Sequence, residues 1–169
     1  MLTACYCRKR PRSLRSTPIT FVGNLKTFAM TTLNFSVNIN APKEVVWNKL
    51  WNDESYRYWT SVFMEGSYAE SDWQEGSKVR FLTPSGEGMY SVIEKLEPYR
   101  QMTFKHLGEL KEGKEEPKDW GGARESYELA ETNGSTQLTV RLDTTENHQA
   151  YFADVFPKAL EKVRELSEQ

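Results

Sequence analysis

The chain has 169 residues, enough for one domain with a core that needs neither a metal nor disulfides for support. Its net charge of −2 is unevenly distributed: residues 1–29 carry six basic side chains and no acidic one, whereas residues 30–169 carry 16 basic and 24 acidic ones. The acidic body argues against nucleic acid as a partner, because phosphate binding needs clustered cations.

Cysteine and histidine are too scarce after residue 29 for several kinds of site. Both cysteines, Cys5 and Cys7, lie in the basic segment, which excludes a disulfide, a cysteine zinc site and a cysteine nucleophile from the body. The only histidines are His106 and His148, so we expect no histidine-rich metal site. No stretch approaches the roughly 20 apolar residues of a membrane span. We expect a cytoplasmic protein without a metal or cofactor.

Residues 1–29 allow three interpretations. The segment is basic and free of acidic residues, and it loosely resembles a mitochondrial presequence, but it lacks the apolar run of a signal peptide. Met30 directly precedes the first expected strand and looks like a natural start. We therefore expect an extension that is disordered or foreign to the native protein, with a targeting peptide or a functional basic arm as alternatives. The domain is expected to span 30–169.

Residues 31–59 change abruptly from a strand pattern to a helix pattern. Apolar and polar side chains alternate over 33–40, which predicts a strand with one buried face. Pro42 fits the first turn of a helix over 44–51, where its missing N–H group costs nothing. A second short helix follows over 53–59, with Asp53 placed to cap it.

The remaining chain is expected to form strands and one final helix. Strands are expected over 63–70, 78–83, 88–96, 101–107, 124–130 and 137–142, with Asn133-Gly134 as a strong hairpin signal. Residues 108–122, rich in charged side chains, are expected to form one long loop. An apolar stripe predicts a helix over 147–166, which Pro157 should kink.

Three motifs in this order resemble the START-like (SRPBCC) superfamily, and within it the subfamily named for the activator of the heat-shock ATPase. The first is the stretch 35–42 followed by Val45 and Trp47, the second is 92–98 followed by 102–104, and the third is the hairpin 126–140. The resemblance covers 31–168. It implies an α+β helix-grip fold: a curved antiparallel sheet of about six or seven strands, two short helices after the first strand, and a long C-terminal helix on the concave face.

The resemblance also implies a cavity between the sheet and the helix, which in many members accepts an apolar ligand. Alternation places His106 and Glu125 on inward-facing positions, where the family pattern tends to have apolar or aromatic residues. With Tyr127 they could bind a polar ligand group or move a proton. An inward Glu125 would need a partner, for which Arg80, Arg124 and Arg141 are candidates. The alternative, which we favour, gives both residues a structural role or an exposed position at the rim, because each lies near a strand end beside the long loop.

Aromatic side chains are the other candidates for contact with a ligand. Trp120 lies between charged residues and glycines, which suggests a lid, with packing on the domain edge as the alternative. Trp47, Trp51, Tyr58, Trp59 and Phe63 could line an entrance or simply form core. The complete set of expected ligand-binding residues is Trp59, Phe63, Phe81, Phe104, His106, Trp120, Tyr127, Tyr151 and Phe152.

Three functions follow as hypotheses. The first is a module that binds a small apolar or amphipathic molecule in the cavity. The second is a protein-interaction module, similar to the co-chaperone domain of the family and using the Trp120 loop. The third is a cyclase- or hydrolase-like enzyme that uses His106 with Glu125 or Tyr127. The sequence leaves the ligand, the pathway and the oligomeric state open.

Overall fold

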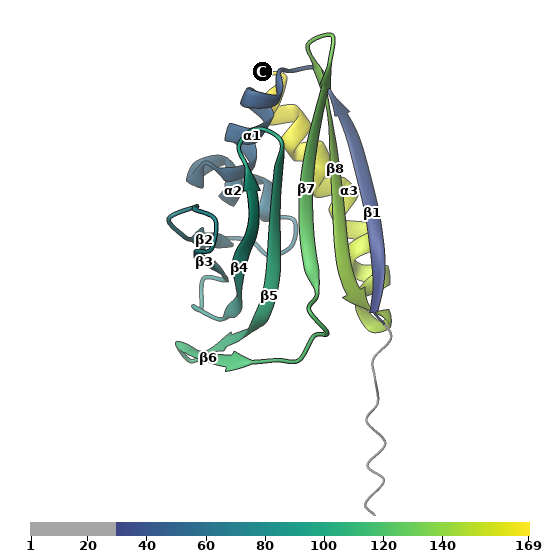
Figure 1. Ribbon diagram of the computed structural model, residues 1–169. Coiled ribbons are helices and arrows are strands. Elements are labelled where there is room, and N and C mark those ends of the chain that lie inside the picture. The colour runs from purple at the N-terminus through teal and green to yellow at the C-terminus, as the bar shows by residue number, and fades with distance from the viewer. Residues whose placement is uncertain (1–29) are drawn as a thin grey trace, which may run out of the picture.

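A computed structural model of the protein describes residues 30–169, so the three interpretations of 1–29 lie outside the described residues. The fold is α+β: a curved antiparallel sheet holds a long helix, α3, against one face (Figure 1). In chain order the elements are β1 (Met30–Ile39), α1 (Lys43–Trp51), α2 (Asp53–Thr60), β2 (Tyr68–Glu70), β3 (Lys78–Leu82), β4 (Gly88–Glu97), β5 (Gln101–Lys111), β6 (Lys114–Pro117), β7 (Arg124–Thr132), β8 (Ser135–Thr145) and α3 (Glu146–Ser167).

The sheet follows the order β1-β8-β7-β5-β4-β3-β2, and the short β6 pairs with the end of β5. The first strand, β1, pairs with the last strand, β8, and places Phe35 opposite Val140. Inward side chains of these strands pack on the apolar stripe of α3, and the rings of Phe35 and Phe156 stack at 4.9 Å. The helix-grip arrangement expected from the sequence is therefore confirmed.

The expectation of a single long loop over 108–122 is wrong. Strand β5 continues to Lys111, and Glu112 and Gly113, both with positive φ, form a two-residue turn into β6. Gly108 permits this pairing, because a Cβ atom there would lie 2.2 Å from the carbonyl oxygen of Glu116. Only the stretch after β6, which contains Trp120, remains without a strand.

Two smaller expectations are also corrected. The strand expected over 63–70 is reduced to β2, because residues 61–66 form turns after α2. The cap of α2 is Asn52 rather than Asp53. Asn52 has an extended backbone, and its Oδ1 accepts a hydrogen bond from the Glu54 N–H at 3.1 Å. Asp53 already lies in the helix, where it pairs with Arg57 at 2.8 Å.

Candidate functional site: a cavity between the sheet and α3

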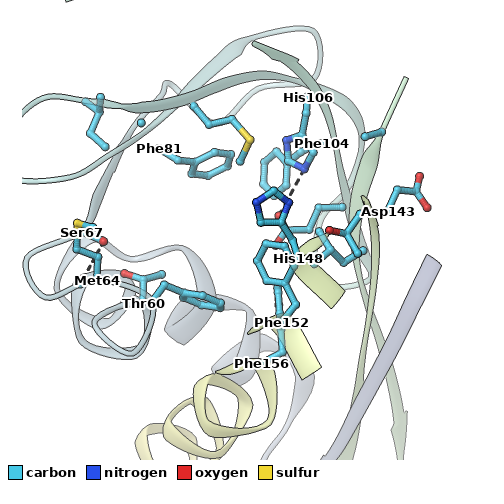
Figure 2. A pocket seen from close by; sticks show the side chains of 18 of the residues that line it. Thr60, Met64, Ser67, Phe81, Phe104, His106, Asp143, His148, Phe152 and Phe156 are labelled. Carbon is cyan, nitrogen blue, oxygen red and sulfur yellow. Dashed lines mark hydrogen bonds and ion pairs between the residues drawn. The ribbon is translucent and has the colours of Figure 1, made fainter. Parts of the chain in front are cut away.

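A cavity of about 470 Å³ lies between the sheet and the helices. One wall is formed by α3, from which His148, Phe152 and Phe156 point into the cavity in a row, with Phe81 and Phe104 of the sheet across from them (Figure 2). The end of α2 and the turns after it form another wall, which includes Thr60, Met64 and Ser67. His148, Met64 and Met30 are exposed lining residues, and we call their edge the mouth.

Most of the expected ligand-binding side chains line this cavity. They are Trp59, Phe63, Phe81, Phe104, His106, Trp120, Tyr127 and Phe152. Tyr151 does not line it, and its inclusion was wrong: the side chain is 46% exposed, and its hydroxyl donates to the Phe63 carbonyl oxygen at 3.1 Å. Neighbouring residues of a helix point about 100° apart, so Phe152 and Tyr151 cannot face the same space.

The polar residues singled out from the sequence meet at one end of the cavity. The hydroxyl of Tyr127 donates to Oε1 of Glu125, and Nε2 of His106 lies 3.6 Å from Oε2 of the same carboxyl group. The other ring nitrogen of His106, Nδ1, is 2.8 Å from the hydroxyl of Ser91. We call Ser91, His106, Glu125 and Tyr127 the polar cluster.

Strand register explains why the cluster forms. Glu125 on β7 pairs with Phe104 on β5, so the inward positions of the two strands lie side by side. The interpretation of His106 and Glu125 as exposed rim residues is wrong: His106 is 7% exposed and the Glu125 side chain 15%. Strand β5 does not end at residue 107, and the Trp120 ring lies 6.5 Å from the His106 ring, edge to face.

Burial controls the protonation of the cluster. Desolvation raises the pKa of Glu125 from 4.5 to about 7, although the hydrogen bond from Tyr127 acts in the opposite direction. Desolvation also lowers the pKa of His106 from 6.5 to about 4, so this imidazole is neutral at pH 7. The pKa of Tyr127 is raised by burial and by the nearby carboxyl group, so its hydroxyl stays a donor.

None of the three arginines considered as partners reaches Glu125. They pair on the outer face of the sheet instead: Arg80 with Glu115, Arg124 with Glu94 and Arg141 with Glu128, at 3.3, 2.8 and 2.9 Å. Glu125 therefore relies on a neutral donor, Tyr127, within a buried site. All three arginines lie on the face of the sheet opposite to Glu125, so none of these candidates is its partner.

The aromatic residues combine core and cavity roles. Trp51 packs against the core and also lines the cavity, where its ring lies 5.0 Å from that of Tyr127 and 5.5 Å from that of Phe104. Trp59 is 2% exposed and also lines the cavity, whereas Tyr58 is 47% exposed on the outside of α2. Core and lining were therefore not exclusive alternatives for these side chains.

Sequence reasoning missed several residues of the site. Tyr56, Phe156 and His148 line the cavity, and Ser91 belongs to the polar cluster. Ser91 reaches His106 because the β4–β5 register shifts between Tyr90 and Ser91, an irregularity with no strong sequence signal. His148 and Phe156 lie four residues before and after Phe152 in the last helix, and this spacing was the available signal.

Within residues 30–169 we find no group of three or more His, Cys, Asp or Glu side chains arranged to hold a metal ion. None of the helices described is both long enough and apolar enough to cross a membrane.

The fold recurs in several solved structures. The Aha1 dimer from Colwellia psychrerythraea shares 19% identity at a TM-score of 0.65, over 82% of this chain and 96% of that one. CalU16 from Micromonospora echinospora shares 19% identity at 0.59, over 80% and 75% of the two chains. Protein MLL2253 from Mesorhizobium loti shares 15% identity at 0.62, over 80% and 96%. These likenesses concern the fold alone.

The comparison with curated proteins found no match to this chain. The family described as Activator of Hsp90 ATPase homolog 1-like protein, in contrast, matches residues 40–168, from the end of β1 to the end of α3. That match includes the three motifs that suggested the relationship, apart from the first five residues of the first one. The chain belongs to the Activator of Hsp90 ATPase homolog 1-like family.

Proposed function

We propose that the protein binds one small, largely apolar molecule in the cavity between the sheet and α3. The observation that carries the proposal is the cavity itself: about 470 Å³, within the range of roughly 300–1,000 Å³ typical of small-molecule sites. Its walls are mainly aromatic and aliphatic, with a few convergent polar groups at one end. That combination suits a molecule with an apolar body and one polar group.

Membership of the family supports a small ligand-binding or interaction domain in general terms. Within that range, Trp120 favours the ligand-binding alternative, because its indole packs toward His106 in the cavity wall. A cytoplasmic location and the lack of a nucleic-acid partner stay predictions from the sequence.

The proposal can be tested by filling the cavity. Ser67 lines the wall after α2, so Ser67→Trp should place an indole where the ligand would lie. The probe is N-phenyl-1-naphthylamine, an uncharged apolar dye whose fluorescence rises in apolar surroundings. We expect the wild-type protein to bind one dye molecule, and the variant to bind it roughly tenfold more weakly or not at all.

The matched control is Ser85→Trp, since Ser85 is exposed in the turn between β3 and β4 and does not line the cavity. This variant should bind the dye as the wild type does. Equal dye binding by Ser67→Trp and the wild type would contradict the proposal, as would a wild type that binds no dye.

A second candidate function is proton transfer to or from a bound molecule, which the convergence of His106, Glu125 and Tyr127 favours. A carboxyl group with a pKa near 7 is suited to act as a general base at neutral pH. Such a base would accelerate deuterium uptake into a carbon acid such as 4-phenyl-2-butanone. Glu125→Gln should abolish that acceleration while dye binding persists; an undiminished rate would exclude this role.

A further inference from the structure

The carboxyl groups that line the cavity are not matched by lysine or arginine side chains among the described lining residues. Among the described residues, the lining contains three carboxyl groups, on Glu109, Glu125 and Asp143, and neither a lysine nor an arginine. The two imidazoles of the lining are His106, which is neutral at pH 7, and His148 at the mouth. An anionic ligand would therefore meet acidic groups and no fixed cation.

Two of the three carboxylates already have partners near the surface. Glu109 lies 2.7 Å from the ammonium group of Lys111 and 3.4 Å from that of Lys118. Asp143 accepts hydrogen bonds from the Thr32 hydroxyl at 2.6 Å and from the backbone N–H of Arg124 at 3.1 Å. Glu109 is therefore paired with cations and Asp143 is hydrogen-bonded, so neither carboxylate lacks a partner that a ligand would have to supply.

Glu125 differs from both, because the nearest cation-forming group is His106 at 3.6 Å and that ring is neutral at pH 7. An ionised carboxylate without a counterion is unfavourable in a buried site, and the pKa of Glu125 is raised accordingly. A positively charged ligand group would supply the missing counterion and favour the ionised form.

The surrounding rings favour the same sign of charge. The ring of Tyr127 lies 6.3 Å from those of Phe104 and Trp59, and all three line the cavity beside Glu125. Aromatic faces carry partial negative charge and attract cations within about 6 Å.

We propose that the cavity selects a cationic amphiphile: an aryl or alkyl amine whose ammonium group pairs with Glu125 and whose apolar body lies against Phe81, Phe152 and Phe156. This inference rests on the proposed function of the cavity and adds the charge of its ligand. It assigns Glu125 as the residue that determines specificity and predicts that fatty acids and other anionic amphiphiles bind poorly.

The test uses three naphthalene probes that differ only in their polar end: 2-(1-naphthyl)ethylamine, 2-(1-naphthyl)ethanol and 3-(1-naphthyl)propanoate. Titration calorimetry of the full chain at pH 7.5 should show the amine binding roughly tenfold or more tightly than the carboxylate, with the alcohol between them. Glu125→Gln should reduce the affinity for the amine to that for the alcohol. The control Glu128→Gln, on the same strand but outside the cavity, should keep the wild-type order.

A second measurement needs no variant. Because Glu125 must be ionised to pair with the amine, amine affinity should rise roughly tenfold or more between pH 5.5 and 8.5, while alcohol affinity stays constant. The other titratable groups around Glu125 are Tyr127, Tyr56 and His106, with Glu109, Asp143 and His148 toward the surface. The alcohol probe reports any effect of these groups that does not depend on ligand charge.

The outcomes separate the two proposals. If the alcohol binds but the amine binds no more tightly than the carboxylate, the cavity is a ligand site without the proposed charge preference. An amine preference that survives Glu125→Gln would also overturn the assignment of Glu125. If none of the three probes binds to the wild-type protein, both proposals fail.

Discussion

At the scale of single residues, Glu125 and His106 oppose each other in their response to pH. The folded-state pKa of Glu125, about 7, exceeds its ordinary value of 4.5, so the stability that its protonated form contributes is present at acidic pH and lost as pH rises toward 7. The folded-state pKa of His106, about 4, is below its ordinary 6.5, so its contribution is present above pH 6.5 and lost as pH falls toward 4.

We therefore expect Glu125→Gln to reveal the pH dependence of stability that comes from His106. Between pH 4.5 and 6.5 the two effects nearly cancel in the wild type, whereas in the variant the free energy of unfolding should rise by about 1.4 kcal/mol per pH unit. Relative to the wild type, the variant should gain roughly 3 kcal/mol between pH 4.5 and 7. Urea unfolding at several pH values measures this difference.

The control Glu128→Gln keeps the polar cluster intact, so its unfolding free energy should follow the wild-type pH profile. Parallel profiles for Glu125→Gln and the wild type would contradict the shifted pKa of Glu125 and with it the lack of a counterion.

At the scale of elements, the start of α2 distinguishes two neighbouring residues that the sequence alone did not separate. Asn52 and Asp53 are both good capping residues, but only Asn52 has the extended backbone of a cap and accepts the Glu54 N–H. Asp53, one position later, stabilises the first turn through Arg57 and the helix dipole.

We expect Asn52→Ala to lower the free energy of unfolding by about 1 kcal/mol, since it removes the side-chain acceptor of the cap. Asp53→Ala should lower it by less, about 0.3–0.5 kcal/mol, because an exposed ion pair within a helix contributes little. Chemical unfolding of both variants checks the order, and a larger loss for Asp53→Ala would restore the original assignment of the cap.

The hairpin of β5 and β6 is the secondary structure that the sequence patterns failed to predict. Charged residues suggested a loop, although Glu112-Gly113 sits between two runs that pair closely, with Lys111 opposite Lys114. What decides the pairing is the backbone contact at Gly108, which depends on a neighbour eight residues away and leaves no periodicity in the sequence. An edge strand rich in charged side chains is therefore easily mistaken for a loop when only the sequence is considered.

At the scale of the molecule, the order of helices and strands expected from the sequence was enough to predict most of the fold. A strand, two short helices, a run of strands and a long amphipathic helix predicted the helix-grip architecture, because each pattern matched the period of its element. The cavity was an implication of the resemblance only. Its volume depends on how side chains from several elements fill the space between them, and periodicity fixes the face of a side chain but not the distance across the fold.

The two ends of the described chain lie at opposite ends of the molecule (Figure 1). Met30 belongs to the mouth, whereas α3, with 22 residues and thus a length of roughly 33 Å, carries the chain away from it to Glu168, whose carboxylate accepts the Asn40 N–H. A purification tag or fluorophore attached after Gln169 would lie far from the mouth of the cavity. The same label attached just before Met30 would lie next to the mouth and could interfere with ligand entry. Labelled samples for titration should therefore carry their handle at the C-terminal end.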